Sequence, residues 1–163
     1  MLDVGDSLSV GTAPFLSSRL HGYRIVRIHD VGLHAEDVAE IVRERAAALP
    51  EVLVVSAGTN DDPRLVSRFS RSVEVVIAAA GGQRCVVWPN IVRPRAVGAS
   101  YAGYNRVLRR AGARHDRLVV VDWASLVRKH SRWLATDGVH ASGAGYRARA
   151  AAIAAAVATR CSA

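Results

Sequence analysis

Five short runs of aliphatic and β-branched residues, separated by longer segments with helical periodicity, constrain the fold of this chain more than any other feature. The strand-like runs span residues 2–4, 23–28, 52–56, 85–88 and 118–121. This alternation is typical of a parallel sheet covered by helices. The runs are short and apolar, which suits strands that are buried on both faces. We therefore predict an α/β fold with five strands.

Two segments between these runs carry apolar residues on one helical face. The first spans residues 38–49 and is followed by Pro50, a common stop signal. The second begins at Asp62 and Pro63, which resemble an N-cap and a first-turn proline, and it ends at Gly81. We predict a helix over each of these segments.

Two further helices are predicted in the C-terminal half of the chain. Residues 101–111 present an apolar face that ends at Gly112. Ser142 is placed to cap a final alanine-rich helix, and alanine is the strongest helix former.

Length and composition indicate a globular protein with one domain. The chain has 163 residues, of which 50% are apolar and 22% are charged, and no linker or repeat divides it. No apolar run approaches the roughly 18 residues of a membrane helix, and no signal peptide is apparent. We predict one domain over residues 1–163 and, by default, a cytoplasmic location.

The net charge of +8 is a possible sign of a polyanionic partner. Its distribution argues against nucleic acid, because the basic residues are scattered over predicted helix faces and no aromatic-rich basic stripe accompanies them. Nearly all of them are arginines, with Lys129 the only lysine. The two cysteines, Cys85 and Cys161, are too few for a disulfide framework or a cysteine metal site, so we expect free thiols.

Ser7 directly follows the first predicted strand, at the edge where open parallel sheets bind ligands. It belongs to the sequence Gly5-Asp6-Ser7-Leu8 and precedes a helical segment whose first amides favour developing negative charge. A nucleophile suits this position. Asp and Ser are also common N-caps, so by itself the motif indicates a helix start first.

Asp137 and His140 lie three residues apart, just before the final predicted helix. A serine hydroxyl becomes a good nucleophile only when a nearby imidazole takes its proton, and a carboxylate must orient that imidazole. Taken singly, Asp137 with Gly138 indicates a turn, and His140 is one of six histidines. Together with Ser7, the three residues form a candidate triad that the ends of the first and last strands bring together.

The stretch Gly58-Thr59-Asn60-Asp61 follows the third predicted strand. Acyl transfer generates an oxyanion, and a preorganised asparagine amide stabilises it by about 3–4 kcal/mol of barrier. Asn60 is therefore a candidate donor, although asparagine also favours turns and helix caps. Gly32, after the second strand, is a candidate backbone donor or simply the residue that permits a tight turn.

In order and approximate spacing, these blocks resemble the four motif blocks of the SGNH (GDSL) hydrolase superfamily, and the resemblance covers essentially the whole chain. It implies a flavodoxin-like, three-layer αβα sandwich with a five-stranded parallel sheet. It also implies a serine esterase with Ser7 as nucleophile, His140 as base and Asp137 as the residue that orients it. The implied oxyanion hole consists of the amides of Ser7 and Gly32 and the side chain of Asn60, with no cofactor and no metal.

A narrower resemblance concerns SGNH domains that are attached to membrane O-acetyltransferases of polysaccharides or peptidoglycan. Residues 121–123 and 133–140 look like their counterparts in those domains, and Asn105 fits the same pattern. Asp61 departs from it, since those domains often have glycine there and free-standing esterases have aspartate. Trp123 and Trp133 are more simply explained as packing residues. Membership in a larger membrane acyltransferase implies an extracytoplasmic location.

We therefore predict an esterase that cleaves short-chain, acetyl-type esters of a small molecule or carbohydrate through an acyl-enzyme. Residues 89–99 follow the fourth strand and are expected to border the acyl pocket. No wide apolar lid is apparent, which favours a short acyl group over long-chain lipids. Two alternatives are an O-acyltransferase that acts on a carbohydrate acceptor and a non-catalytic binding module that kept the fold.

Overall fold

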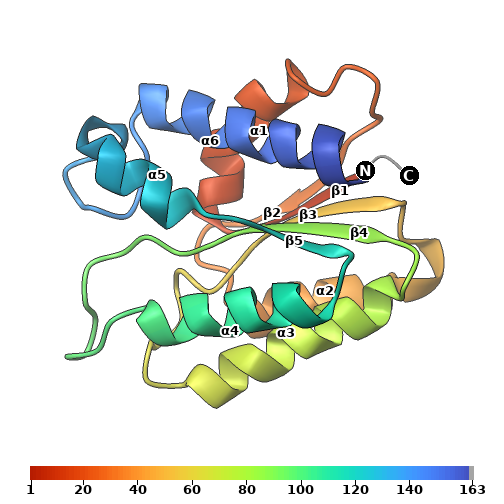
Figure 1. The fold of residues 1–163 in the computed structure, drawn as a ribbon, viewed down its shortest axis with the longest axis horizontal. Helices are drawn as coiled ribbons and strands as arrows, with labels where there is room; N and C mark the ends of the chain where they lie inside the picture. The colour runs from red at the N-terminus through yellow and green to blue at the C-terminus, as the bar shows by residue number, and fades with distance from the viewer. Residues whose placement is uncertain (162–163) are drawn as a thin grey trace.

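Five parallel strands form one sheet in the order β2-β1-β3-β4-β5 (Figure 1). The computed structural model describes residues 1–161. The strands are β1 (Leu2–Gly5), β2 (Val26–His29), β3 (Val52–Ser56), β4 (Cys85–Pro89) and β5 (Leu118–Val121). The α/β class and the five-stranded parallel sheet are confirmed.

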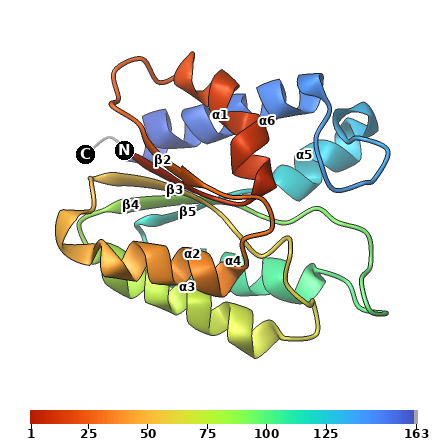
Figure 2. The same cartoon turned by 180° about the vertical axis from the view of Figure 1, so that it is seen from behind.

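Helices cover both faces of the sheet and give three layers, which Figure 2 shows from behind. One face carries α1 (Ser7–Ser17), α5 (Trp123–Lys129) and α6 (Gly143–Ala156). The other carries α2 (Ala35–Glu44), α3 (Val66–Ala80) and α4 (Ala102–Arg114). Three short helical turns complete the described chain: η1 (Ala46–Ala48), η2 (Ser131–Trp133) and η3 (Val157–Cys161). Within residues 1–161, no helix has both the length and the apolar character needed to cross a membrane.

Each face of the sheet buries its own apolar core, because successive side chains of a strand point to opposite faces. In β3, Leu53 and Val55 belong to the core under α2, α3 and α4, while Val52 and Val54 belong to the core under α1 and α6. Burying each such side chain contributes about 1.5–3 kcal/mol, so the central strands are firmly held. The carboxyl ends of these strands are thereby fixed as a platform for the loops that follow them.

Strand β2 differs from the prediction in its start and in its burial. It begins at Val26 instead of residue 23, and its four residues are exposed or half-buried. Because β2 is the outermost strand and pairs only with β1, one of its edges faces solvent. Burial on both faces was therefore wrong for this strand.

Three predicted helix boundaries also differ from the structure. The first helix ends at Glu44, before residue 49, and a short turn continues it. Helix α3 starts at Val66, because Asp62 accepts the backbone amide of Arg64 at 3.0 Å and so closes a turn ahead of the helix. Helix α4 continues past Gly112 to Arg114. Gly112 lies against β5, where an added Cβ would meet Val120 at 3.1 Å.

The expectation of free thiols is wrong, because Cys85 and Cys161 form a disulfide. Cys85 is the first residue of β4, at the amino edge of the sheet. Helix α6 and its continuation η3 run back to that edge, so residues 76 positions apart in the sequence meet with their Cα atoms 5.4 Å apart. A single bridge of this kind needs only spatial proximity, which two isolated cysteines do not reveal in the sequence.

Candidate active site

Ser7 is the first residue of α1 and lies at the carboxyl edge of the sheet, directly after β1. Asp6 caps this helix, because its side chain accepts the backbone amide of Leu8 at 3.0 Å. The amide of Ser7 belongs to the first helical turn, where backbone N–H groups have no acceptor within the helix. Ser7 is half-buried, whereas Asp6 is fully buried beside it.

The three residues of the predicted triad meet in one chain of hydrogen bonds. The Oγ of Ser7 lies 2.9 Å from Nε2 of His140, although 133 residues separate them in the sequence. On the other side of the ring, Nδ1 of His140 lies 2.7 Å from Oδ2 of Asp137. The second carboxylate oxygen, Oδ1, accepts the backbone amides of Val139 at 2.9 Å and His140 at 3.0 Å.

These contacts fix the charge of Asp137. The hydrogen bonds from the His140 ring and from two backbone amides lower the pKa of Asp137 to about 2. The carboxylate is therefore ionised at neutral pH and can only accept. It selects the imidazole tautomer in which Nδ1 donates and Nε2 accepts the proton of the Ser7 hydroxyl.

Asn60 and the loop that contains Gly32 lie together at the same sheet edge. The side-chain amide of Asn60 donates to the backbone carbonyl of Leu33 at 3.0 Å. This bond uses one of the two amide hydrogens and orients the other. Gly32 is exposed and has a positive φ of 89°, which glycine adopts without strain. The structure thus joins the two loops, while their roles as oxyanion donors stay a prediction.

Two tyrosine hydroxyls and one arginine hold the loop that carries Asn60, and no sequence pattern marked these residues as part of the site. Tyr101 and Tyr104 of the α4 segment donate their hydroxyls to the carbonyls of Asp61, at 2.9 Å, and Asp62, at 2.6 Å. Arg93 donates to the carbonyl of Thr59. Burial raises the pKa of Tyr104, so its hydroxyl remains a donor. The two tyrosines appeared in the sequence only as part of an apolar helix face.

Gly58 lets the same loop turn closely over the core. Its φ of 104° is strained for any residue with a side chain. An added Cβ would also lie 2.6 Å from Phe69 and 2.7 Å from Ile91. The backbone that presents Asn60 is therefore fitted to the core beneath it.

A buried arginine lies beneath the site. Arg149 of α6 is only 2% exposed, and its Nη2 donates to the hydroxyl of Ser56 at 2.5 Å and its Nη1 to that of Thr12 at 3.2 Å. Its charge attracts the buried carboxylates of Asp6 and Asp3. Burial raises the pKa of Asp6, and the nearby positive charge of Arg149 opposes that shift.

The segment of residues 89–99 connects both functional loops. Pro94 packs against Gly138, where an added Cβ would lie 3.0 Å from its ring, and Arg93 reaches Thr59 as described above. Asn105 holds the start of this segment, because its side-chain amide both donates to and accepts from the backbone of Ile91 at 2.8 Å. That segment therefore contacts both the loop that carries Asn60 and the loop that carries Asp137 and His140.

Trp123 and Trp133 stack against each other at a centroid distance of 5.9 Å, and Trp123 is 1% exposed. The structure thus supports their interpretation as packing residues.

An open parallel sheet with an activated serine, an imidazole and a carboxylate at its carboxyl edge defines the class of α/β serine hydrolases. The sequence agrees with this class. Residues 4–148 match the model of the GDSL-like Lipase/Acylhydrolase family. The chain belongs to this family and is a carboxylic ester hydrolase of the SGNH/GDSL type.

Solved structures share the fold of this chain. The C-terminal catalytic domain of peptidoglycan O-acetyltransferase A (OatA) from Streptococcus pneumoniae superposes with a TM-score of 0.80 at 19% identity, over 98% of this chain and 92% of that one. A member of the lipolytic protein G-D-S-L family from Veillonella parvula gives 0.77 at 14% identity, over 97% and 96%. A carbohydrate esterase family 3 protein from Talaromyces cellulolyticus gives 0.74 at 15% identity, over 99% and 98%.

A comparison with curated protein sequences gives no significant match. At these identities, the structural likenesses show a shared fold.

Proposed function

We propose that this protein is a serine esterase that cleaves short acyl esters of a carbohydrate or another small alcohol. The observation that carries the proposal is the hydrogen-bonded chain from Ser7 through His140 to Asp137 at the carboxyl edge of the sheet. Family membership supports the reaction class, and the geometry supports the role of each residue.

In the proposed reaction, the Oγ of Ser7 attacks the ester carbonyl while Nε2 of His140 accepts the hydroxyl proton. The π electrons of the carbonyl group move onto its oxygen, which becomes an oxyanion. The Ser7 amide, the Gly32 amide and the Asn60 side chain stabilise this oxyanion. The tetrahedral intermediate collapses, the bond to the alcohol oxygen breaks, and His140 donates its proton to that oxygen. Water then attacks the acyl-enzyme with His140 again as base, which releases the acid and restores Ser7.

A short acyl group is supported by the sequence, which shows no wide apolar lid near the predicted acyl pocket. A long acyl chain needs a deep apolar pocket that buries most of its surface. An acetyl group needs little more than the oxyanion donors themselves.

Acyl transfer to a carbohydrate hydroxyl is the second candidate, and the likeness to the OatA catalytic domain favours it. The acyl-enzyme step is the same in both cases. In transfer, an acceptor hydroxyl replaces water and gives up its proton to His140. Supplying candidate oligosaccharides together with an acyl donor separates the two, because transfer yields acylated sugar and hydrolysis yields free acid.

We also propose that the protein works in an oxidising, extracytoplasmic compartment. The disulfide between Cys85 and Cys161 supports this, because disulfides persist in such compartments and are rare in the cytosol. Thiol labelling of protein recovered from its native source tests it. Quantitative labelling of both cysteines without reductant would contradict the proposal.

Turnover of nitrophenyl esters of increasing chain length tests the esterase proposal. Ser7→Ala should abolish turnover of nitrophenyl acetate without changing the unfolding temperature. Ser18→Ala, at the other end of the same helix, is the matched control and should behave like the parent. Parental activity in Ser7→Ala would refute the assigned nucleophile, and a preference for long chains would refute the short acyl group.

A further inference from the structure

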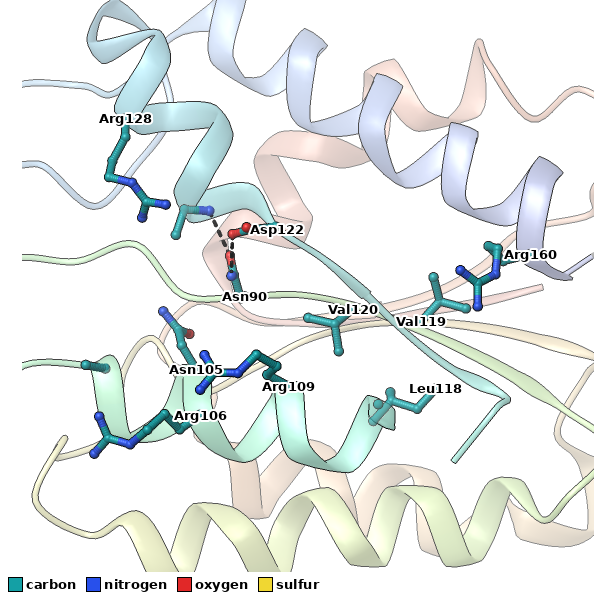
Figure 3. A pocket seen from close by; sticks show the side chains of 13 residues that line it. Asn90, Asn105, Arg106, Arg109, Leu118, Val119, Val120, Asp122, Arg128 and Arg160 are labelled. Carbon is teal, nitrogen blue, oxygen red and sulfur yellow. Dashed lines mark hydrogen bonds between the residues drawn. The ribbon is translucent and has the colours of Figure 1, made fainter. Parts of the chain in front are cut away.

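The cavity of about 640 Å³ lies along the outer edge of β5, between α4 and α5, and is separate from the Ser7 site (Figure 3). Strand β5 is the last strand of the sheet, so its outer edge pairs with no other strand among residues 1–161. Four arginines line this cavity: Arg106 and Arg109 come from α4, Arg128 from α5 and Arg160 from η3. We refer to it as the arginine groove.

The positive charge of the arginine groove is not balanced by its own residues. Within residues 1–161, Arg106, Arg109 and Arg160 form no ion pair with a carboxylate, and Arg128 donates to the hydroxyl of Ser125. Other surface arginines do form such pairs, as Arg43, Arg64, Arg68 and Arg114 illustrate.

The only acidic residue that lines the groove is Asp122, and its oxygens are already engaged. Oδ1 accepts from the side chain of Asn90 at 2.8 Å and from the amide of Ser125 at 3.1 Å, while Oδ2 accepts the Ser125 hydroxyl at 2.5 Å. The groove therefore holds a formal excess of three positive charges, and its four arginines are exposed.

The chemistry of the lining selects among anionic ligands. Guanidinium groups pair with carboxylate and phosphate oxygens through two parallel hydrogen bonds. No aromatic side chain lines the groove, so it lacks the stacking platform that single-stranded nucleic acids use. It is instead walled by short aliphatic and amide side chains, which suit a hydroxyl-rich chain.

The groove is also placed to guide a polymer toward the active site. Asn90 follows β4 and Asp122 follows β5, so both lie at the carboxyl edge of the sheet, where Ser7 follows β1. A chain bound along β5 therefore emerges at the edge that carries the nucleophile. We propose that the arginine groove binds the carboxylate groups of an acidic polysaccharide, and that the polysaccharide carries the ester. Only this last link to the ester rests on the proposed function.

Binding of fluorescein-labelled polygalacturonate, followed by anisotropy at about 50 mM salt, tests the proposal. The groove variant R106Q/R109Q should bind at least about tenfold more weakly than the parent, because two charge-assisted contacts are lost. The variant R128Q/R160Q, which alters the opposite wall, should show a similar loss. The matched control R71Q/R110Q removes two exposed arginines outside the groove and should change binding less than about twofold.

Three results would overturn the proposal. Equal weakening in R71Q/R110Q would show that net charge, and not the groove, binds the polymer. Unchanged binding in both groove variants would exclude the site. Tighter, groove-dependent binding of a single-stranded oligonucleotide or a polyphosphate would show that the occupant is not a carboxylated polysaccharide. Thermal unfolding of every variant verifies that it is folded.

The same variants separate the groove from the esterase. Turnover of nitrophenyl acetate, a small neutral ester, should be unchanged in R106Q/R109Q. Ser7→Ala should lose turnover and keep its affinity for polygalacturonate. A failure of the esterase assignment therefore leaves the binding result intact, and the reverse also holds.

Discussion

Replacing Arg149 with methionine tests the buried charges beneath the nucleophile. In the native protein, one fully buried guanidinium attracts the carboxylates of Asp6 and Asp3 and donates to the hydroxyls of Ser56 and Thr12. Arg149→Met keeps an unbranched apolar side chain and removes the charge. Asp6 then loses the largest positive charge acting on it, while Asp3 keeps the His29 ring, whose Nε2 lies 3.1 Å from Oδ2. Leaving a buried carboxylate without its compensating charge costs about 3–5 kcal/mol of unfolding free energy.

For a chain of this length, that loss lowers the Tm by roughly 6–20 °C. The loss of stability caused by Arg149→Met should also depend on pH. Burial already raises the pKa of Asp6, and loss of Arg149 raises it further. Because the folded state then prefers the protonated carboxyl, the penalty is full above that pKa and shrinks as the pH falls through it. Denaturant unfolding at pH 7 and pH 5 should thus show a smaller difference from the parent at pH 5.

Arg147→Met on the same helix is the matched control. Its guanidinium is exposed and lies over the ring of Phe15 at 5.3 Å, so its removal should cost less than about 1 kcal/mol. Adding Asp3→Asn to Arg149→Met should restore part of the lost stability, because one of the two buried carboxylates that the guanidinium attracted disappears. Equal effects of the two arginine substitutions, or no pH dependence, would refute the account of this network.

Three further predictions concern the triad and the disulfide. Asp137→Asn should lower kcat for nitrophenyl acetate roughly ten-thousand-fold, because the imidazole loses the acceptor that fixes its tautomer; a loss below about tenfold would argue against that role. In the parent, Asp137, with a pKa of about 2, should stay ionised and add no step to the activity in the neutral range, which a pH–rate profile checks. Cys161→Ser opens a loop of 76 residues and should cost about 2–4 kcal/mol, or a Tm decrease of roughly 5–15 °C, whereas an unchanged Tm would mean that the bridge contributes nothing.

The sequence predicted the sheet and the triad because both depend on local patterns. Residues 52–56 and 118–121 were predicted with the bounds that the structure shows. Ser7, Asp137 and His140 could be placed because each follows or precedes an element whose end was recognisable. In a parallel sheet, such ends converge on one edge.

What the sequence did not show depends on contacts between distant residues. Arg149 lies in an alanine-rich helix, where an arginine is normally solvated. Only the fold reveals that it is buried, donates to Ser56 and Thr12, and attracts the carboxylates of Asp6 and Asp3. The disulfide joins a strand start to the end of the last helix. Similarly, the arginines appeared scattered along the chain, and four of them gather only at the edge of β5.

Covalent labelling of the nucleophile tests most directly that distant segments assemble an activated serine. A fluorophosphonate should modify the parent at one site, and mass spectrometry of the peptides should place the adduct on Ser7. His140→Ala should label far more slowly at the same pH, since no base then takes the hydroxyl proton. An adduct on another residue, or equal labelling of Ser7→Ala, would contradict the account.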